Sequence, residues 1–146
     1  MAGGTANAVM PKVRLADNTF ETEVKSFELD KTGLFDIKYN AKVNNNFTLD
    51  DVEKSGFDAI FIGAGMCENT GMPIDNKPKG VYSALDFLYK VKRDKFSLEG
   101  VATAAVIGGG NTAMDAAFSL KEYGVQNVYI IYRRSYNELP AWKSEV

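Results

Sequence analysis

The residues best suited to chemistry lie between Val106 and Leu120, in the segment VIGGGNTAMDAAFSL. Gly108, Gly110 and Ala113 have the spacing G-x-G-x-x-A, which occurs in turns that bind the pyrophosphate of a dinucleotide. The first glycine permits a sharp bend from strand to helix, the second lets the backbone approach the phosphates, and the small third residue lets the helix pack closely. The amides at the start of the helix would then face the anion. We therefore expect the pyrophosphate to contact Gly108, Gly109, Gly110, Asn111, Thr112 and Ala113.

Glycine-rich turns after strands are often only structural, so the surroundings of this motif matter. An apolar run at 101–107 precedes it, a helical pattern at 111–124 follows it, and a second apolar run begins at Asn127. A strand, a helix and a second strand within about 30 residues form the unit in which the motif binds nucleotides. The sequence favours nucleotide binding over a purely structural turn.

Two arginines, Arg133 and Arg134, follow the second apolar run. A carboxylate about 20 residues beyond the glycine motif would bind the ribose 2′-hydroxyl of NAD or FAD, and Arg133 lies at that distance from Ala113. Guanidinium groups instead form charge-assisted, often bidentate hydrogen bonds with phosphate. The pair predicts binding of the 2′-phosphate of NADP(H); the alternative is a solvated basic pair at a strand end.

A second glycine-ended segment, DAIFIGAG, covers residues 58–65. Its continuous apolar run at 59–62 is typical of a strand buried on both faces of a parallel sheet. Polar residues rather than a helical pattern follow it, so we do not expect a second pyrophosphate site. Gly63, Ala64 and Gly65 are predicted to lie where the backbone passes close to FAD, with a purely structural turn as the alternative.

Residue types that are scarce in the chain limit its chemistry. There is no histidine and a single cysteine, Cys67. This composition excludes histidine-dependent nucleophiles, histidine metal ligands and an internal disulfide. We interpret Cys67 as a small buried residue, and we expect no catalytic side chain and no metal ligand in this chain. A bound cofactor would have to carry any redox chemistry.

Strands and helices alternate along the chain, which is typical of an α/β fold with a parallel sheet. We predict Rossmann-like βαβ units that form parts of two nucleotide-binding domains. Beyond those around the glycine motif, the expected elements are helices at 18–33, at 48–56 and from Ser83, and strands at 35–43 and 59–62. The boundary is expected in the aperiodic loop at 66–81, so that residues 1–74 and 78–146 belong to different domains.

The composition is that of a globular protein: 45% of the 146 residues are hydrophobic and 25% are charged. A net charge of −2 gives no electrostatic reason to expect a nucleic-acid or anionic-membrane partner. No apolar run reaches the roughly 18 residues of a membrane span, and the N-terminal residues lack the pattern of a signal peptide. We expect a cytoplasmic protein.

Several motifs together resemble the NADPH- and FAD-binding module of the glutamate synthase small (β) subunit. They are VIGGGNTAMDAAFSL, VYIIYRRSYNELPAW, GFDAIFIGAG, KGVYSALDFL and AGGTANAVMPKVRL. The same module is found in dihydropyrimidine dehydrogenase, in NADH-dependent ferredoxin:NADP oxidoreductases and in selenate reductase-like iron–sulfur subunits. The resemblance covers essentially the whole chain, and the combination GGGNTAMD…YRRS…LPA is fairly specific to this family.

The resemblance implies a flavin-dependent oxidoreductase in which NADPH passes a hydride to FAD and electrons leave through iron–sulfur clusters to a redox partner subunit or domain. Residues 1–74 would be part of the FAD domain, and residues 78–146 the first half of the NADPH domain inserted into it. The cluster cysteines would lie outside this chain. The chain would thus be a fragment, which we expect to be inactive alone and prone to self-association.

Two other functions would also use an NADP-binding turn. A short-chain NADP dehydrogenase would need a Tyr-x-x-x-Lys pair, and none of the seven tyrosines has a lysine four places later. An NADP-binding regulatory or sensing domain without catalysis remains the alternative.

Overall fold

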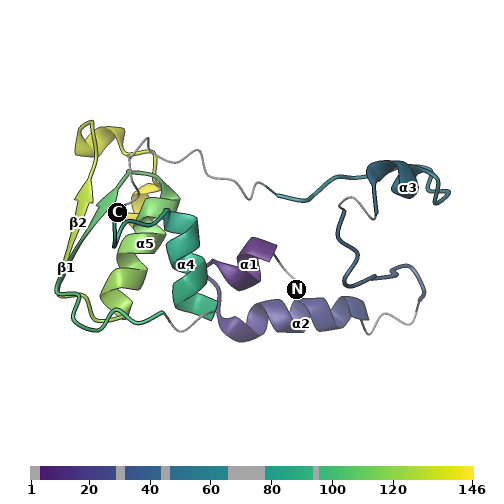
Figure 1. The fold of residues 1–146 in the computed structure, drawn as a ribbon, viewed down its shortest axis with the longest axis horizontal. Helices are drawn as coiled ribbons and strands as arrows, with labels where there is room; N and C mark the ends of the chain where they lie inside the picture. Colours follow the sequence, from purple (N-terminus) through teal and green to yellow (C-terminus); the bar gives the residue numbers. More distant parts are fainter. Residues whose placement is uncertain (1–3, 29–31, 44–46, 66–77, 94–95) are drawn as a thin grey trace.

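The computed structural model describes residues 4–28, 32–43, 47–65, 78–93 and 96–146. In chain order the elements are α1 (Gly4–Ala8), α2 (Asp17–Glu28), α3 (Leu49–Glu53), α4 (Ala84–Arg93), β1 (Thr103–Ile107), α5 (Asn111–Glu122), β2 (Asn127–Ile131) and the 3₁₀ helices η1 (Tyr136–Glu138) and η2 (Lys143–Glu145). Helices α4 and α5 lie beside the sheet, whereas α3 lies at the opposite end of the long axis (Figure 1). The protein is a mixed α/β chain with a small parallel sheet.

The strand–helix–strand unit predicted around the glycine motif is confirmed. Strands β1 and β2 pair in parallel, from Thr103 opposite Asn127 to Ile107 opposite Ile131, and α5 connects them. The helix stops at Gly124, whose φ of 91° suits glycine, and the Val125 N–H donates to the Leu120 carbonyl at 3.0 Å. This unit therefore forms from signals that lie close together in the sequence.

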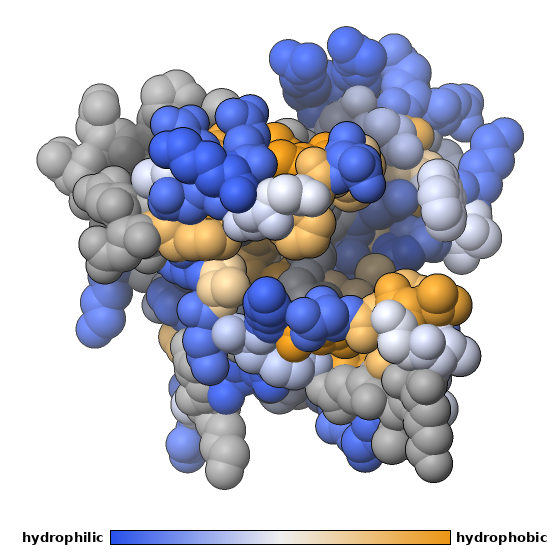
Figure 2. Space-filling model, turned by 90° about the vertical axis from the view of Figure 1, so that its right-hand side faces the viewer, coloured by the Kyte–Doolittle hydropathy of each residue, from blue (hydrophilic) through white to orange (hydrophobic). Residues whose placement is uncertain are grey.

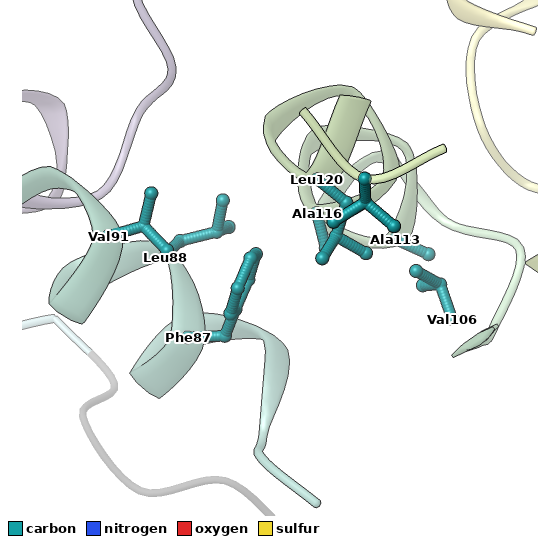
Figure 3. Packing of buried hydrophobic residues seen from close by; sticks show 8 residues of the cluster. Phe87, Leu88, Val91, Val106, Ala113, Ala116 and Leu120 are labelled. Atoms are coloured by element: carbon teal, nitrogen blue, oxygen red, sulfur yellow. The ribbon is translucent and has the colours of Figure 1, made fainter. Parts of the chain in front are cut away.

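The hydrophobic core lies between α4, α5 and one face of the sheet. Phe87, Leu88 and Val91 of α4 point toward small and medium side chains of α5 and β1 (Figure 3). The alanines of α5 leave room for this approach, and Leu88 is only 2% exposed. The packed members of this cluster are Phe87, Leu88, Val91, Val106, Ala113, Ala116, Leu120 and Val125. The core thus packs α4 against α5, the helix that follows the glycine turn.

The prediction of a buried strand at 59–62 is wrong. These residues have no strand geometry, and Phe61 is 95% exposed. Figure 2, which views the molecule from the α3 side, shows hydrophobic side chains at the surface among hydrophilic ones. A strand needs a hydrogen-bonded neighbour, and within the described residues the only ladder joins β1 to β2. The apolar run is present, but no strand among the described residues lies beside it.

The prediction of a strand at 35–43 is also wrong, again because no neighbouring strand pairs with it in the described residues. Its residues are not in strand geometry, and Phe35 and Tyr39 are 55% and 46% exposed. The alternating pattern predicted one buried face, yet the described residues place no sheet against it. The edge-to-face contact between Phe35 and Phe27 of α2, with ring centroids 5.1 Å apart, partly covers that face.

The helices expected from local start signals do form. A capping box opens α3, the helix expected at 48–56: the Thr48 hydroxyl accepts from the Asp51 N–H at 3.3 Å, and the Asp51 carboxylate accepts from the Thr48 N–H at 2.8 Å. At α4 the Asp86 N–H donates to the Ser83 hydroxyl. Helix α2 begins at Asp17, one residue before the expected start at Asn18. No helix within the described ranges is long and apolar enough to cross a membrane.

The chain's two ends are joined by an ion cluster around Arg14. Its guanidinium pairs with Asp115 of α5 and with Glu145 of η2. The hydrogen bond with Glu145 is the main cause that raises the pKa of Arg14 above its usual range. Because the Arg14 side chain is 21% exposed, water screens its pairing less than it screens a fully exposed ion pair.

Replacing Arg14 by methionine is expected to lower the free energy of unfolding by about 2 kcal/mol, because two carboxylates lose a charge-assisted hydrogen-bond partner. Denaturant unfolding would measure the change. The matched control is Lys38→Met, whose pair with Asp36 is at least 76% exposed and should contribute under about 1 kcal/mol. Equal effects of the two substitutions would show that the Arg14 cluster adds no stability.

The sheet face opposite α5 is apolar and uncovered. Alternate residues point to opposite faces of a strand, so Ile107, Tyr129 and Ile131 lie on this outer face, and they are 60%, 59% and 53% exposed. An uncovered face of this kind favours association. We expect light scattering at micromolar concentration to give a mass above the 16.0 kDa of one chain. Ile131→Lys should reduce the mass, and a monomer at every concentration would contradict the prediction.

Candidate nucleotide-binding site

The glycine turn begins where β1 ends, and Gly108 makes the bend. Its φ is 140°, which residues with side chains rarely adopt, and its N–H donates to the Ile131 carbonyl at 2.9 Å. A Cβ at Gly108 would lie 3.5 Å from the Cβ of Ala113, an ordinary contact. Backbone conformation rather than lack of space therefore requires glycine here, and Ala113 sits against the turn as the motif predicts.

Gly109 is glycine for a different reason. It is buried, and a Cβ would lie 2.6 Å from Cδ2 of Leu139 and 2.7 Å from Cδ2 of Tyr132. Its carbonyl accepts a hydrogen bond from the Ala141 N–H at 3.0 Å. The structure thus places Gly109 beneath the segment that follows β2, where packing within the protein leaves no room for a side chain.

Gly110, unlike Gly109, has open space where a side chain would lie. It is the N-cap of α5 with φ −91° and ψ 174°, an extended conformation available to any residue, and a Cβ would meet nothing within 4 Å. No side chain caps the helix, while the Ala113 and Met114 N–H groups bond to the Gly110 carbonyl. By helix geometry the two preceding amides, of Asn111 and Thr112, have no acceptor inside the helix. They can donate to an anion and have the dipole of a 12-residue helix behind them.

The arginine pair lies at the same edge of the sheet as this turn. Because the strands are parallel, their carboxyl ends are neighbours, and the bond from Gly108 to Ile131 joins them. Arg133 and Arg134 follow β2 after one intervening residue, Tyr132, and are both exposed. Neither guanidinium forms an ion pair within the described part of the chain. The parallel pairing of β1 and β2 thus places the glycine turn and the arginine pair, which the sequence spacing had linked, at one edge of the sheet.

The residues predicted near FAD are not part of this site. Gly63, Ala64 and Gly65 are exposed and belong to the irregular segment that follows α3 (Figure 1). Gly65 has a φ of 75°, which suits glycine. Cys67 and most of the expected boundary loop at 66–81 lie outside the described residues.

The segment 135–142 folds back over the glycine turn, and we call it the strap. It starts with η1, where the Glu138 carboxylate accepts from the Ser135 N–H at 3.1 Å and from the Ser135 hydroxyl at 2.7 Å. The Tyr132 hydroxyl donates to the Glu138 carbonyl at 3.2 Å. At the other end the Trp142 N–H donates to Oδ1 of Asn111 at 3.0 Å. The sequence motifs did not predict the strap, although its capping pair, Ser-x-x-Glu, indicates the start of a helical turn.

Protonating Glu138 is expected to loosen the start of the strap. Hydrogen bonds from the Ser135 side chain and then its backbone lower the pKa of Glu138 below its ordinary value of 4.5. The stabilisation is therefore complete above the ordinary pKa and is lost as pH falls through the lowered one. At neutral pH the Ser135 amide, which donates to the ionised carboxylate, should exchange more slowly in wild type than in Glu138→Gln, and this difference should disappear in acid. Identical exchange in the two proteins from neutral to acid pH would contradict the expectation.

Comparison with known proteins gives matches along almost the whole chain. The family model described as pyridine nucleotide-disulphide oxidoreductase matches residues 5–145. Subunit beta of the NADP(+)-dependent formate dehydrogenase of Moorella thermoacetica is 34% identical over 151 residues, which cover 100% of this chain and 20% of that protein. The PreT subunit of the NAD-dependent dihydropyrimidine dehydrogenase of Escherichia coli K12 is 32% identical over 143 residues, covering 98% and 34%.

The small chain of glutamate synthase [NADPH] of Escherichia coli K12 is 34% identical over 128 residues, which cover 79% of this chain and 27% of that protein. The chain therefore spans between a fifth and about a third of the length of these three relatives. The resemblance to the glutamate synthase small subunit that the motifs indicated is confirmed. Because the family model covers nearly every residue, the chain belongs to the pyridine nucleotide-disulphide oxidoreductase family.

Proposed function

We propose that this chain is the NADPH-binding part, with a portion of the FAD domain, of an oxidoreductase that passes a hydride from NADPH to FAD and electrons on to iron–sulfur clusters. One observation carries the proposal. The open turn at Gly110 and the exposed arginine pair lie at one edge of a parallel sheet, so that one dinucleotide could meet both. Membership of the family supports the redox function.

The residues of the turn fit the pyrophosphate of a dinucleotide. Gly110 leaves its approach free, and the amides of Asn111 and Thr112 supply the hydrogen bonds. Gly108 and Ala113 shape the turn, and Gly109 supports it from beneath. The nicotinamide and flavin would supply the redox chemistry when bound, and this chain's residues would bind and orient the nucleotide.

The choice of NADP(H) over NAD(H) rests on Arg133 and Arg134. The names of the relatives include both cofactors, since the formate dehydrogenase is NADP(+)-dependent and PreT belongs to an NAD-dependent enzyme. Family membership alone therefore does not select a cofactor. Two exposed guanidinium groups without ion-pair partners in the described chain favour a 2′-phosphate.

The assignment of domains remains part of this proposal. Residues 78–146 would belong to the NADPH domain, residues 1–74 to the FAD domain, and Gly63, Ala64 and Gly65 would lie near the flavin. Among the described residues, we assign a pyrophosphate only to the turn at Gly110. Relatives named as subunits of larger dehydrogenases support a redox partner.

Reduction of bound flavin would test the proposal. In the full-length protein without oxygen, NADPH should bleach the visible flavin absorption, and NADH should do so with a higher half-saturating concentration. Binding of NADP⁺ by a protein without flavin would support a regulatory or sensing domain instead. Failure to bind either nucleotide would show that the glycine turn is only structural.

A further inference from the structure

The strap makes contacts on both sides of Gly110 and leaves Gly110 itself uncovered. Two consecutive strap amides, those of Ala141 and Trp142, donate to the Gly109 carbonyl and to Oδ1 of Asn111, each at 3.0 Å. Leu139 and the ring of Tyr132 fill the space where Gly109 would carry a side chain. Apart from Gly110 and its own chain neighbours, no atom lies within 4 Å of the Cβ position of Gly110. Gly110 is thus open at its Cβ position, while the strap contacts its two neighbours, Gly109 and Asn111.

From these contacts we infer that the strap positions the pyrophosphate-binding turn, with Leu139 and Asn111 as positioning residues. The inference rests on the proposed function and assigns Asn111 a role other than direct cofactor contact through Oδ1. That oxygen accepts the Trp142 N–H and so ties the first residue of α5 to the strap. The amide N–H of Asn111 remains directed outward from the start of the helix.

The strap directly follows the arginine pair in the chain, so it also influences where the two arginines lie. The strap begins at Ser135, directly after Arg134, and its capping pair and the Tyr132 hydroxyl shape the chain there. A single short segment therefore contacts the turn that would hold the pyrophosphate and continues from the residues that would hold the 2′-phosphate. Ordered contacts made before ligand arrives reduce the entropy that binding costs.

The strap is tested with Leu139→Ala in the full-length protein, with Leu139→Met as the matched control that keeps most of the packing on Gly109. Without nucleotide, hydrogen exchange in peptides covering residues 108–113 should rise in Leu139→Ala and stay near wild type in Leu139→Met. Calorimetric titration should show NADP⁺ and NAD⁺ both bound about fivefold more weakly by Leu139→Ala, and unchanged by Leu139→Met. The equal loss is expected because the two nucleotides share the pyrophosphate.

Three results would overturn the inference: unchanged exchange in Leu139→Ala, faster exchange with unchanged affinity, or weaker binding with unchanged exchange. If Leu139→Ala does not fold, Tyr132→Phe replaces it, because it removes only the hydroxyl bond to Glu138. A wild-type protein that binds neither nucleotide would reject the proposed function and the binding role of the strap. The exchange measurement would then still decide whether the strap orders the turn.

Discussion

Replacing Gly110 by valine is expected to weaken the binding of NADP⁺ and NAD⁺ by the same factor, about 100-fold or more, without unfolding the protein. The Cβ of the new residue would occupy the open space through which the pyrophosphate must approach the amides of Asn111 and Thr112. Each lost hydrogen bond to a charged group costs roughly 1.5–3 kcal/mol, and about 1.4 kcal/mol corresponds to a factor of ten. Loss of both bonds accounts for the expected factor.

The fold should tolerate this change because Gly110 has an ordinary conformation. Its φ of −91° is available to valine, and the Cβ would meet no atom within 4 Å. Replacing a glycine N-cap by a β-branched residue should lower the free energy of unfolding by only about 1 kcal/mol. Gly108 and Gly109 do not offer this separation, since their replacement strains the backbone or clashes with Leu139 and Tyr132.

Calorimetric titration of both nucleotides, together with thermal unfolding, would measure the effect in the full-length protein. The matched control is Thr112→Val, which removes an exposed hydroxyl from the same helical turn but keeps the backbone amide. Its affinities should remain within a few-fold of wild type. Unchanged affinity in Gly110→Val would show that the pyrophosphate does not bind at this turn.

Replacing Arg133 by alanine is expected to remove most of the preference for NADPH over NADH. We expect the wild-type preference to be at least about tenfold at low salt, because one charge-assisted hydrogen bond to the 2′-phosphate is worth roughly 1.5–3 kcal/mol. Affinity for NADH should hardly change, since the pyrophosphate contacts come from the backbone around Gly110. Added salt should reduce the preference of the wild type, because exposed charges are screened.

Titrating NADPH and NADH against wild type and variant at two salt concentrations would measure this preference. Lys54→Ala is the matched control, because it removes one exposed positive charge at the end of α3, far from the sheet edge. It should leave the preference intact. Equal losses of NADPH and NADH in Arg133→Ala would identify the arginine as a surface charge without a role in selection.

The sequence by itself determined the unit from β1 to β2. The spacing of Gly108, Gly110 and Ala113 predicted the turn, and the helical pattern at 111–124 predicted α5. The helix expected at 48–56 also forms, and a capping box at Thr48 opens it. Each signal acts within a few residues of the structure that it specifies, because turn conformation, helix capping and helix termination depend on hydrogen bonds and steric contacts between near neighbours in the chain.

Tertiary structure alone decided which apolar runs became strands. The runs at 35–43 and 59–62 carry strand patterns as clear as that of 103–107, yet only the last has a hydrogen-bonded neighbour within the described residues. The hydrophobic pattern of a segment states which side chains favour burial. It does not provide the second strand and the covering helix that make a strand stable.

Tertiary structure also decided that Gly109 is covered while Gly110 is left open. Gly109 is covered because Leu139 and Ala141 lie about 30 residues further along the chain and fold back onto it, whereas Gly110, its neighbour, is left open. Arg14 likewise finds its partners 101 and 131 residues away. Such contacts depend on how α4, α5 and the chain ends pack together, and no short-range pattern of residue types encodes that packing.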